Sequence, residues 1–160
     1  MTEDDVQRVV ASFYAKVGGR VYDLSQGYRP GPKRHATTRQ TPGLGDLWVF
    51  FPLLGAIMWH ETKVLHWSDL SKSDRDLLRE QDPRMKREFF DTILYQRGLD
   101  LLGDDRRRFR YEDKQSPEQK GFEYLCHATG KASYVLGGMT EARVYFESIR
   151  RQVRHVNEGV

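Results

Sequence analysis

The feature that most constrains the fold is a pair of apolar segments in the middle of the chain, separated by a four-residue break. Residues 46–51 and 56–64 are rich in apolar and aromatic side chains, and Pro52-Leu53-Leu54-Gly55 lies between them. The whole run is too short, and too interrupted by Pro and Gly, to cross a bilayer as a helix. Two apolar runs joined by a turn are typical of a β-hairpin, and their hydrophobicity predicts a largely buried sheet.

A helix and a strand are predicted before this hairpin. Apolar side chains recur at spacings of three and four over residues 3–17, which predicts a helix with Thr2 and Asp5 at its capped start. Gly18-Gly19 would end this helix, and the alternation of residues 20–24 predicts a strand.

The C-terminal part of the chain predicts a helix, a strand and a second helix. Ser116-Pro117-Glu118-Gln119 places a cap, a proline at the first helical position and a capping-box glutamine in the expected order. The expected buried face of this helix consists of Phe122, Leu125 and Cys126. A short strand over 132–136 and a final helix capped by Thr140 follow. The element order predicts a single α/β domain over 1–160, with a small mixed sheet flanked by helices.

Residues 65–115 differ from the rest of the chain and are expected to form a helical insertion. They hold 12 Lys or Arg and 12 Asp or Glu residues. The pattern predicts helices over 71–81 and 83–96, and a solvated charge cluster over 104–108. Arginines in and beside that cluster are local candidates for phosphate contact, namely Arg106, Arg107, Arg108 and Arg110.

Composition narrows the class of protein. The only cysteine is Cys126, which excludes a disulfide within the chain and a cysteine-based zinc cage. A reducing, cytoplasmic setting is the simplest expectation, and the acidic start of the chain is unlike a secretory signal. We expect no membrane partner and no nucleotide cofactor. The net charge of +3 and pI of about 9.0 are compatible with a polyanionic partner.

The segment 25–45 combines glycines and prolines with positive charge. It contains Arg29, Lys33, Arg34, His35 and Arg39, and no acidic residue lies between Leu24 and Gly45. Two interpretations stay open: a solvated loop without a ligand, or a loop that contacts nucleic-acid phosphates.

Charged residues at the hairpin form the pattern in this sequence that is most typical of a catalytic site. Glu61 and Lys63 lie two apart in an apolar strand and therefore share one face, while Asp46 begins the neighbouring strand. These residues could be no more than a turn cap and an exposed ion pair. The apolar surroundings of Glu61 favour a functional site, because buried charges are costly unless they are paired or bound to a metal.

These residue types fit metal-assisted hydrolysis of a phosphodiester. Mg²⁺ prefers oxygen ligands, which Asp46, Glu61 and the backbone carbonyl of Thr62 would supply. Lys63 would orient the attacking water or stabilise the charged transition state.

The ordered set of motifs resembles the VRR-NUC branch of the PD-(D/E)xK nuclease superfamily. The set comprises Gly43-x-Gly45-Asp46, the hairpin, Glu61-x-Lys63, and the Ser-Pro-Glu-Gln start at 116–119. Gly18-Gly19 and the segment 138–142 extend the match towards both ends, and residues 65–115 lie outside it. The family has a short turn in place of that insertion, and an aliphatic residue where this chain has His60. We expect His60 on the strand face opposite Glu61.

The resemblance implies a restriction-endonuclease-like core and an Mg²⁺- or Mn²⁺-dependent DNA endonuclease. It implies that Asp46 and Glu61 bind the metal, that Lys63 is the catalytic lysine and that Gln119 is an active-site glutamine as well as a cap. Glu3 falls where many relatives have an acidic residue. Small stand-alone relatives are similar to Holliday-junction resolving enzymes, which implies branched DNA and a homodimer.

Other functions remain open from the sequence. The chain could be a monomeric single-strand or flap nuclease, which would use the same residues. It could also be a non-catalytic DNA-binding module of the same fold, or bind a protein partner through the insertion.

Overall fold

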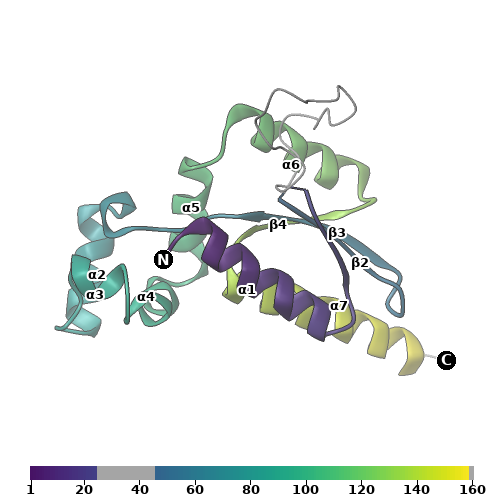
Figure 1. Ribbon diagram of the computed structural model, residues 1–160, viewed down its shortest axis with the longest axis horizontal. Coiled ribbons are helices and arrows are strands. Elements are labelled where there is room, and N and C mark those ends of the chain that lie inside the picture. The colour runs from purple at the N-terminus through teal and green to yellow at the C-terminus, as the bar shows by residue number, and fades with distance from the viewer. Residues whose placement is uncertain (25–45, 159–160) are drawn as a thin grey trace, which may run out of the picture.

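The computed structural model describes residues 1–24 and 46–158, with side chains described up to residue 152 (Figure 1). These residues form a four-stranded sheet and seven α-helices, so the expected mixed α/β class is confirmed. The strands are β1 Arg20–Asp23, β2 Leu47–Phe51, β3 Ala56–Thr62 and β4 Ser133–Gly137. The helices are α1 Glu3–Lys16, α2 Lys72–Gln81, α3 Arg87–Phe90, α4 Tyr95–Leu102, α5 Asp104–Asp113, α6 Pro117–Thr129 and α7 Met139–Glu158, with a 3₁₀-helix, η2, at Trp67–Asp69.

The sheet is mixed and has the order β1-β2-β3-β4. β1–β2 and β2–β3 are antiparallel, and the predicted hairpin is the second of these pairs. β3 and β4 are parallel, so the chain must cross over between them. That crossover contains the whole insertion and α6.

Helices cover both faces of the sheet. In Figure 1, α1 and α7 lie side by side on one face and α6 lies over the other. α1 begins with the predicted capping box between Thr2 and Asp5 and buries Val10 and Tyr14 completely. α7 begins at Met139, so the expectation that Thr140 caps it is wrong; the Thr140 hydroxyl instead accepts a hydrogen bond from Gln96 of the insertion.

Within the insertion, the helix predicted over 71–81 is confirmed, with Ser71 as its cap, but the helix predicted over 83–96 is wrong. α3 and α4 stand in its place, with a turn between them. Asp91 in this turn accepts the backbone N–H of Trp67 at 2.8 Å. The Phe90 ring lies 2.5 Å from where a Cβ would stand on Gly98, so the bend packs one helix closely against the other.

Two apolar residues within the helices predicted over 83–96 and from Ser116 lie at the surface rather than in the core. Ile93 is 79% exposed because it falls in the turn between α3 and α4. Leu125 is 57% exposed on α6, where Glu123 is buried and pairs with Arg108. An apolar pattern cannot reveal a buried ion pair that takes the place of a leucine.

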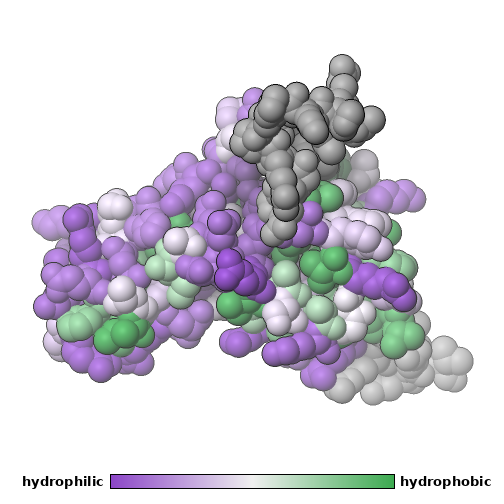
Figure 2. All heavy atoms as spheres, viewed as in Figure 1, coloured by the Kyte–Doolittle hydropathy of each residue, from purple (hydrophilic) through white to green (hydrophobic). Residues whose placement is uncertain are grey.

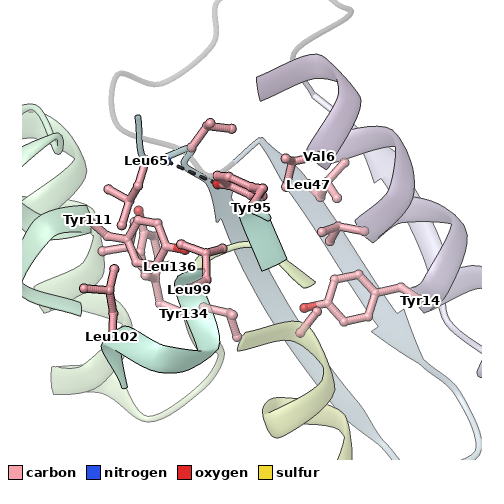
Figure 3. Packing of buried hydrophobic residues seen from close by; sticks show 14 of the residues in the cluster. Val6, Tyr14, Leu47, Leu65, Tyr95, Leu99, Leu102, Tyr111, Tyr134 and Leu136 are labelled. Carbon is pink, nitrogen blue, oxygen red and sulfur yellow. Dashed lines mark hydrogen bonds between the residues drawn. The ribbon is translucent and has the colours of Figure 1, made fainter. Parts of the chain in front are cut away.

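The charge cluster over 104–108 is part of α5 rather than a fully solvated segment. Arg107 is only 3% exposed, and it is held by Asp104, Glu141 and the carbonyl of Leu99. α5 packs against β4, where Tyr111 lies near Tyr134 and Leu136 in the continuous core (Figure 3). The outer surface of the insertion is mostly hydrophilic (Figure 2).

No helix within residues 1–24 and 46–158 combines the length and the apolar character that crossing a bilayer requires.

Candidate active site

The predicted site residues meet at the end of the β2–β3 hairpin. β2 and β3 pair with Leu47 opposite His60, which brings Asp46, one residue earlier, opposite Glu61. Glu61 and Lys63 share the face that α6 covers, and Lys63 Nζ lies 3.5 Å from Glu61 Oε1. The expected same-face arrangement of Glu61 and Lys63 is therefore present, and both residues are buried.

The carboxylate of Asp46 is tied to the backbone of β3. Its Oδ2 accepts the N–H of Thr62 at 2.9 Å. The N–H of Lys63 points the other way, to the Gly137 carbonyl of β4 at 3.2 Å. Because consecutive strand residues direct their backbone groups to opposite sides, the Thr62 carbonyl lies on the Asp46 side. The three oxygen donors expected for a metal thus lie at the same end of the β2–β3 hairpin, Asp46 just before β2 and the other two at the end of β3.

Glu61 is the most enclosed of these groups, with 2% of its surface exposed. Its Oε1 accepts a hydrogen bond of 2.5 Å from Gln119 Nε2. Its Oε2 is buried and has no hydrogen-bond partner among the described residues. A buried carboxylate oxygen without a donor is costly, which makes it a natural position for a cation or an ordered water.

Gln119 caps α6, as expected, and also contacts Glu61. Its Oε1 accepts the backbone N–H of Ser116 at 2.9 Å, and the Ser116 hydroxyl accepts the N–H of Gln119. The same side chain donates to Glu61 through Nε2. The cap of α6 is therefore also a contact to the candidate active site.

Burial makes both carboxyl groups weaker acids, and the charge of Asp46 adds to this effect at Glu61. Burial raises the pKa of Asp46 to about 6, although the Thr62 N–H opposes this change. Burial and the charge of Asp46 raise the pKa of Glu61 to about 8, against the opposing effect of Lys63. Displaced pKa values in a cluster of this kind are common at functional sites. A bound cation would reverse the repulsion and favour both ionised forms.

Two further acids act on the site from neighbouring elements. Glu3, at the start of α1, raises the pKa of both Asp46 and Glu61 through its charge. Asp23, at the end of β1, adds to the effect on Asp46 and accepts a hydrogen bond from Gln7. Glu3 was indicated by its position in the resemblance. Asp23 was missed, because only the β1–β2 register brings it near the site.

His60 lies on the opposite face, as expected, and joins three elements. Its Nε2 donates to the Gly137 carbonyl of β4 at 3.0 Å, and its Nδ1 accepts the hydroxyl of Tyr14 of α1 at 2.8 Å. Burial lowers the pKa of His60 to about 4, so the ring is neutral at pH 7. His60 thus fixes the strand beside Glu61 without adding charge.

A larger metal-binding cluster is not present in the described part of the chain, where no group of three or more His, Cys, Asp and Glu side chains is placed to hold an ion. The donor set of two carboxylates and a backbone carbonyl is smaller than such a cluster. It suits Mg²⁺, which commonly binds one or two carboxylates and keeps several waters.

The expected phosphate contacts divide into two groups. The basic segment with Arg29, Lys33, Arg34, His35 and Arg39 lies outside the described residues. The arginines of α5 are all engaged in salt bridges, with partners Asp74, Asp104, Glu112, Asp113, Glu123 and Glu141. Their charge is therefore largely neutralised within the insertion.

Comparison of the chain with protein-family models, with curated proteins and with solved structures finds no match. The chemistry assigned to the site therefore depends on its own residues.

Proposed function

We propose that this chain is an Mg²⁺- or Mn²⁺-dependent nuclease that hydrolyses DNA phosphodiester bonds on a restriction-endonuclease-like core. The observation that carries the proposal is the pair of carboxylates on opposed residues, half-buried Asp46 and buried Glu61, with Lys63 on the Glu61 face. Carboxylates that face each other in a low dielectric are unfavourable unless something positive joins them.

The residues fit a hard divalent cation. Asp46 and Glu61 would hold it, with the Thr62 carbonyl as a third oxygen, and the unpartnered Glu61 Oε2 is free to serve. Bound there, the ion would neutralise phosphate charge and lower the pKa of the attacking water.

The chain's own side chains supply the remaining functions. Lys63 places a cation on the Glu61 face, where it can orient the water or stabilise charge on the phosphate oxygens. Water loses a proton as its oxygen attacks phosphorus, the bond to the leaving oxygen breaks, and that oxygen takes up a proton from solvent, so one P–O bond replaces another. Gln119 holds Glu61 in place through Nε2 and leaves Oε2 available.

Branched DNA and a homodimer form the finer part of the proposal. Both depend on the resemblance to VRR-NUC nucleases, in which a two-fold pair of sites would cut symmetric strands of a junction. The carboxylates and lysine specify phosphodiester chemistry and would serve a monomeric flap nuclease equally well.

The test is cleavage of labelled four-way junction, flap, duplex and single-stranded DNA, each with Mg²⁺ and with Mn²⁺. Wild type would be compared with Glu61→Gln and with Glu118→Gln, which changes an exposed acid on α6 and serves as the matched control. We expect metal-dependent cutting that only Glu61→Gln abolishes. Paired symmetric cuts in the junction would support a homodimer that acts on branched DNA. Cuts confined to flaps or single strands would instead support a monomeric nuclease. Binding without any metal-dependent cutting would overturn the nuclease and favour a DNA-binding module.

A further inference from the structure

An open groove of about 620 Å³ lies between α1 and α7, on the face of the sheet opposite α6. Its walls hold three cationic side chains, Arg8 and Lys16 from α1 and Arg143 from α7. All three are exposed. In Figure 2 the surface over these two helices mixes hydrophilic and hydrophobic residues.

These three cations differ from those of the insertion. Within the residues that the structure describes, Arg8, Lys16 and Arg143 form no salt bridge. By contrast, every arginine of α5 has a carboxylate partner. The one acid lining the groove, Asp5, caps α1 with Thr2 and keeps its negative charge, which Arg8 favours, so three cations and one anion leave the lining with a net charge of +2. Positive charge that is not neutralised within the protein is the part available to a polyanion.

The spacing of the polar groups along α1 fits a nucleic-acid backbone. Arg8, Ser12 and Lys16 recur every four residues and so follow one helix face. They span about 12 Å of the helix axis. A DNA strand carries a phosphate about every 3.4 Å of its axis, so this span faces three or four phosphates.

We propose that the α1–α7 groove binds the phosphate backbone of DNA, and this inference rests on the proposed nuclease function. α1 begins at Glu3, whose charge acts on both Asp46 and Glu61, so the groove leads away from the candidate active site. The groove and the Glu61–Lys63 face lie on opposite sides of the sheet, so an arm of DNA lying along α1 would reach the site around the end of the sheet near Glu3.

An acidic amphipathic helix is the other partner that a basic groove could bind. Such a partner needs open apolar pockets for its anchor side chains. Phe13 and Met139 at the groove are packed against the protein's own core, and only Val9, at 55% exposed, remains largely open. The groove therefore offers three cations and only one largely open apolar side chain, which favours phosphate contacts over an apolar anchor.

The test measures binding separately from cleavage. Fluorescence anisotropy would follow a labelled four-way junction and a labelled duplex with the full chain in EDTA, over a range of salt concentrations. The groove variant is Arg8→Gln/Lys16→Gln/Arg143→Gln. The control is Lys72→Gln/Lys86→Gln/Arg87→Gln, which removes the same charge from exposed positions of the insertion. Circular dichroism would establish that both variants are folded.

We expect the groove variant to lose roughly tenfold or more in affinity and its salt slope to fall by about 2 to 3, as expected for the loss of three phosphate contacts. The control should stay close to wild type. Equal weakening of both variants, unchanged binding by the groove variant, or no DNA binding by wild type would overturn the proposal. A labelled poly-glutamate peptide that binds with the same dependence on the groove as DNA would also overturn it, in favour of an acidic protein partner.

The outcomes separate this proposal from the nuclease. If DNA binds through the groove but is never cut with Mg²⁺ or Mn²⁺, only the proposed nuclease activity is overturned. If the groove variant binds and cuts DNA as wild type does, only the proposed role of the groove is overturned.

Discussion

Gln119 Nε2 donates a 2.5 Å hydrogen bond to Glu61 Oε1 across 58 residues of sequence. The bond joins the first turn of α6 to the strand that carries the candidate site. The insertion lies between these two residues in the chain, and the contact is made in spite of it. A site fixed in this way tolerates a long insertion, because Gln119 and Glu61 join the two elements, α6 and β3, that flank it.

Gln119→Glu is expected to separate the capping role from the active-site role. Glutamate also satisfies the capping box with Ser116, so α6 should remain stable. A second carboxylate beside Glu61 would remove the donor that positions Glu61 and add negative charge, so we expect an altered Mg²⁺ dependence and at least roughly tenfold slower cleavage, the scale of one misplaced polar contact. The thermal midpoint and the Mg²⁺ dependence of cleavage would be measured together.

Ser116→Ala is the complementary control for this prediction. It should lower stability by about 1 kcal/mol through loss of the cap and leave cleavage of the folded protein near the wild-type rate. If Gln119→Glu retains normal metal dependence and rate, the bond to Glu61 has no functional role.

The metal-free protein is expected to lose stability as pH rises from about 5 to about 8. In the folded state, burial raises the pKa of Glu61 from an ordinary value near 4.5 to about 8. The unfolded chain therefore releases this proton at lower pH than the folded chain does, and the free energy of unfolding falls across the interval between the two pKa values. Asp46, whose pKa is raised to about 6, acts in the same direction at the lower end of that range.

Urea midpoints in EDTA at pH 5.5 and pH 8.5 would check this prediction. Glu61→Gln should flatten the pH dependence, whereas Glu118→Gln should leave it unchanged. Adding Mg²⁺ at pH 8.5 should restore stability to the wild type, because an ion bound by the folded state alone stabilises it. A wild-type protein that becomes more stable over the same interval would contradict the assigned pKa values.

Lys63→Met is expected to lower the cleavage rate by about 10²–10⁴, the usual effect of removing a positioned catalytic group. Methionine fills most of the space of the buried lysine stem, which keeps β3 packed. DNA affinity in EDTA should change little, because this one ammonium is buried beside Glu61. Single-turnover rates would be compared with those of Lys131→Met, which removes an exposed lysine, and equal rates for the two variants would exclude a catalytic role.

Local signals were sufficient to predict much of this fold and most of the candidate site. The caps predicted at Thr2 and Ser116 depend on residues three apart, and both are present as capping boxes. The hairpin follows from a turn between two apolar runs, and strand alternation alone puts Glu61 and Lys63 on one face. These features were predictable because each is decided within a few residues.

What could not be predicted depends on contacts between distant segments. The break between α3 and α4 follows from Asp91 meeting Trp67, which a helical apolar pattern does not contain. Glu123 is buried in place of Leu125 because α5 presents Arg108 to it. Asp23 joins the site only through strand register. In each case a tertiary contact overrides a local preference.

The pairing of Arg107 with Glu141 is expected to hold the insertion on the sheet. Arg107 Nε lies 2.9 Å from Glu141 Oε1, and Glu141 Oε2 accepts the N–H of Gly138 at the β4–α7 turn. Glu141→Ala would leave a guanidinium that is 3% exposed without this partner, so we expect a loss of about 2–4 kcal/mol in the free energy of unfolding. Arg107→Met/Glu141→Gln should recover much of that loss, because no buried charge then lacks a partner. Urea denaturation of the two variants and wild type would test this, and a Glu141→Ala protein as stable as wild type would show that the pair does not hold the insertion in place.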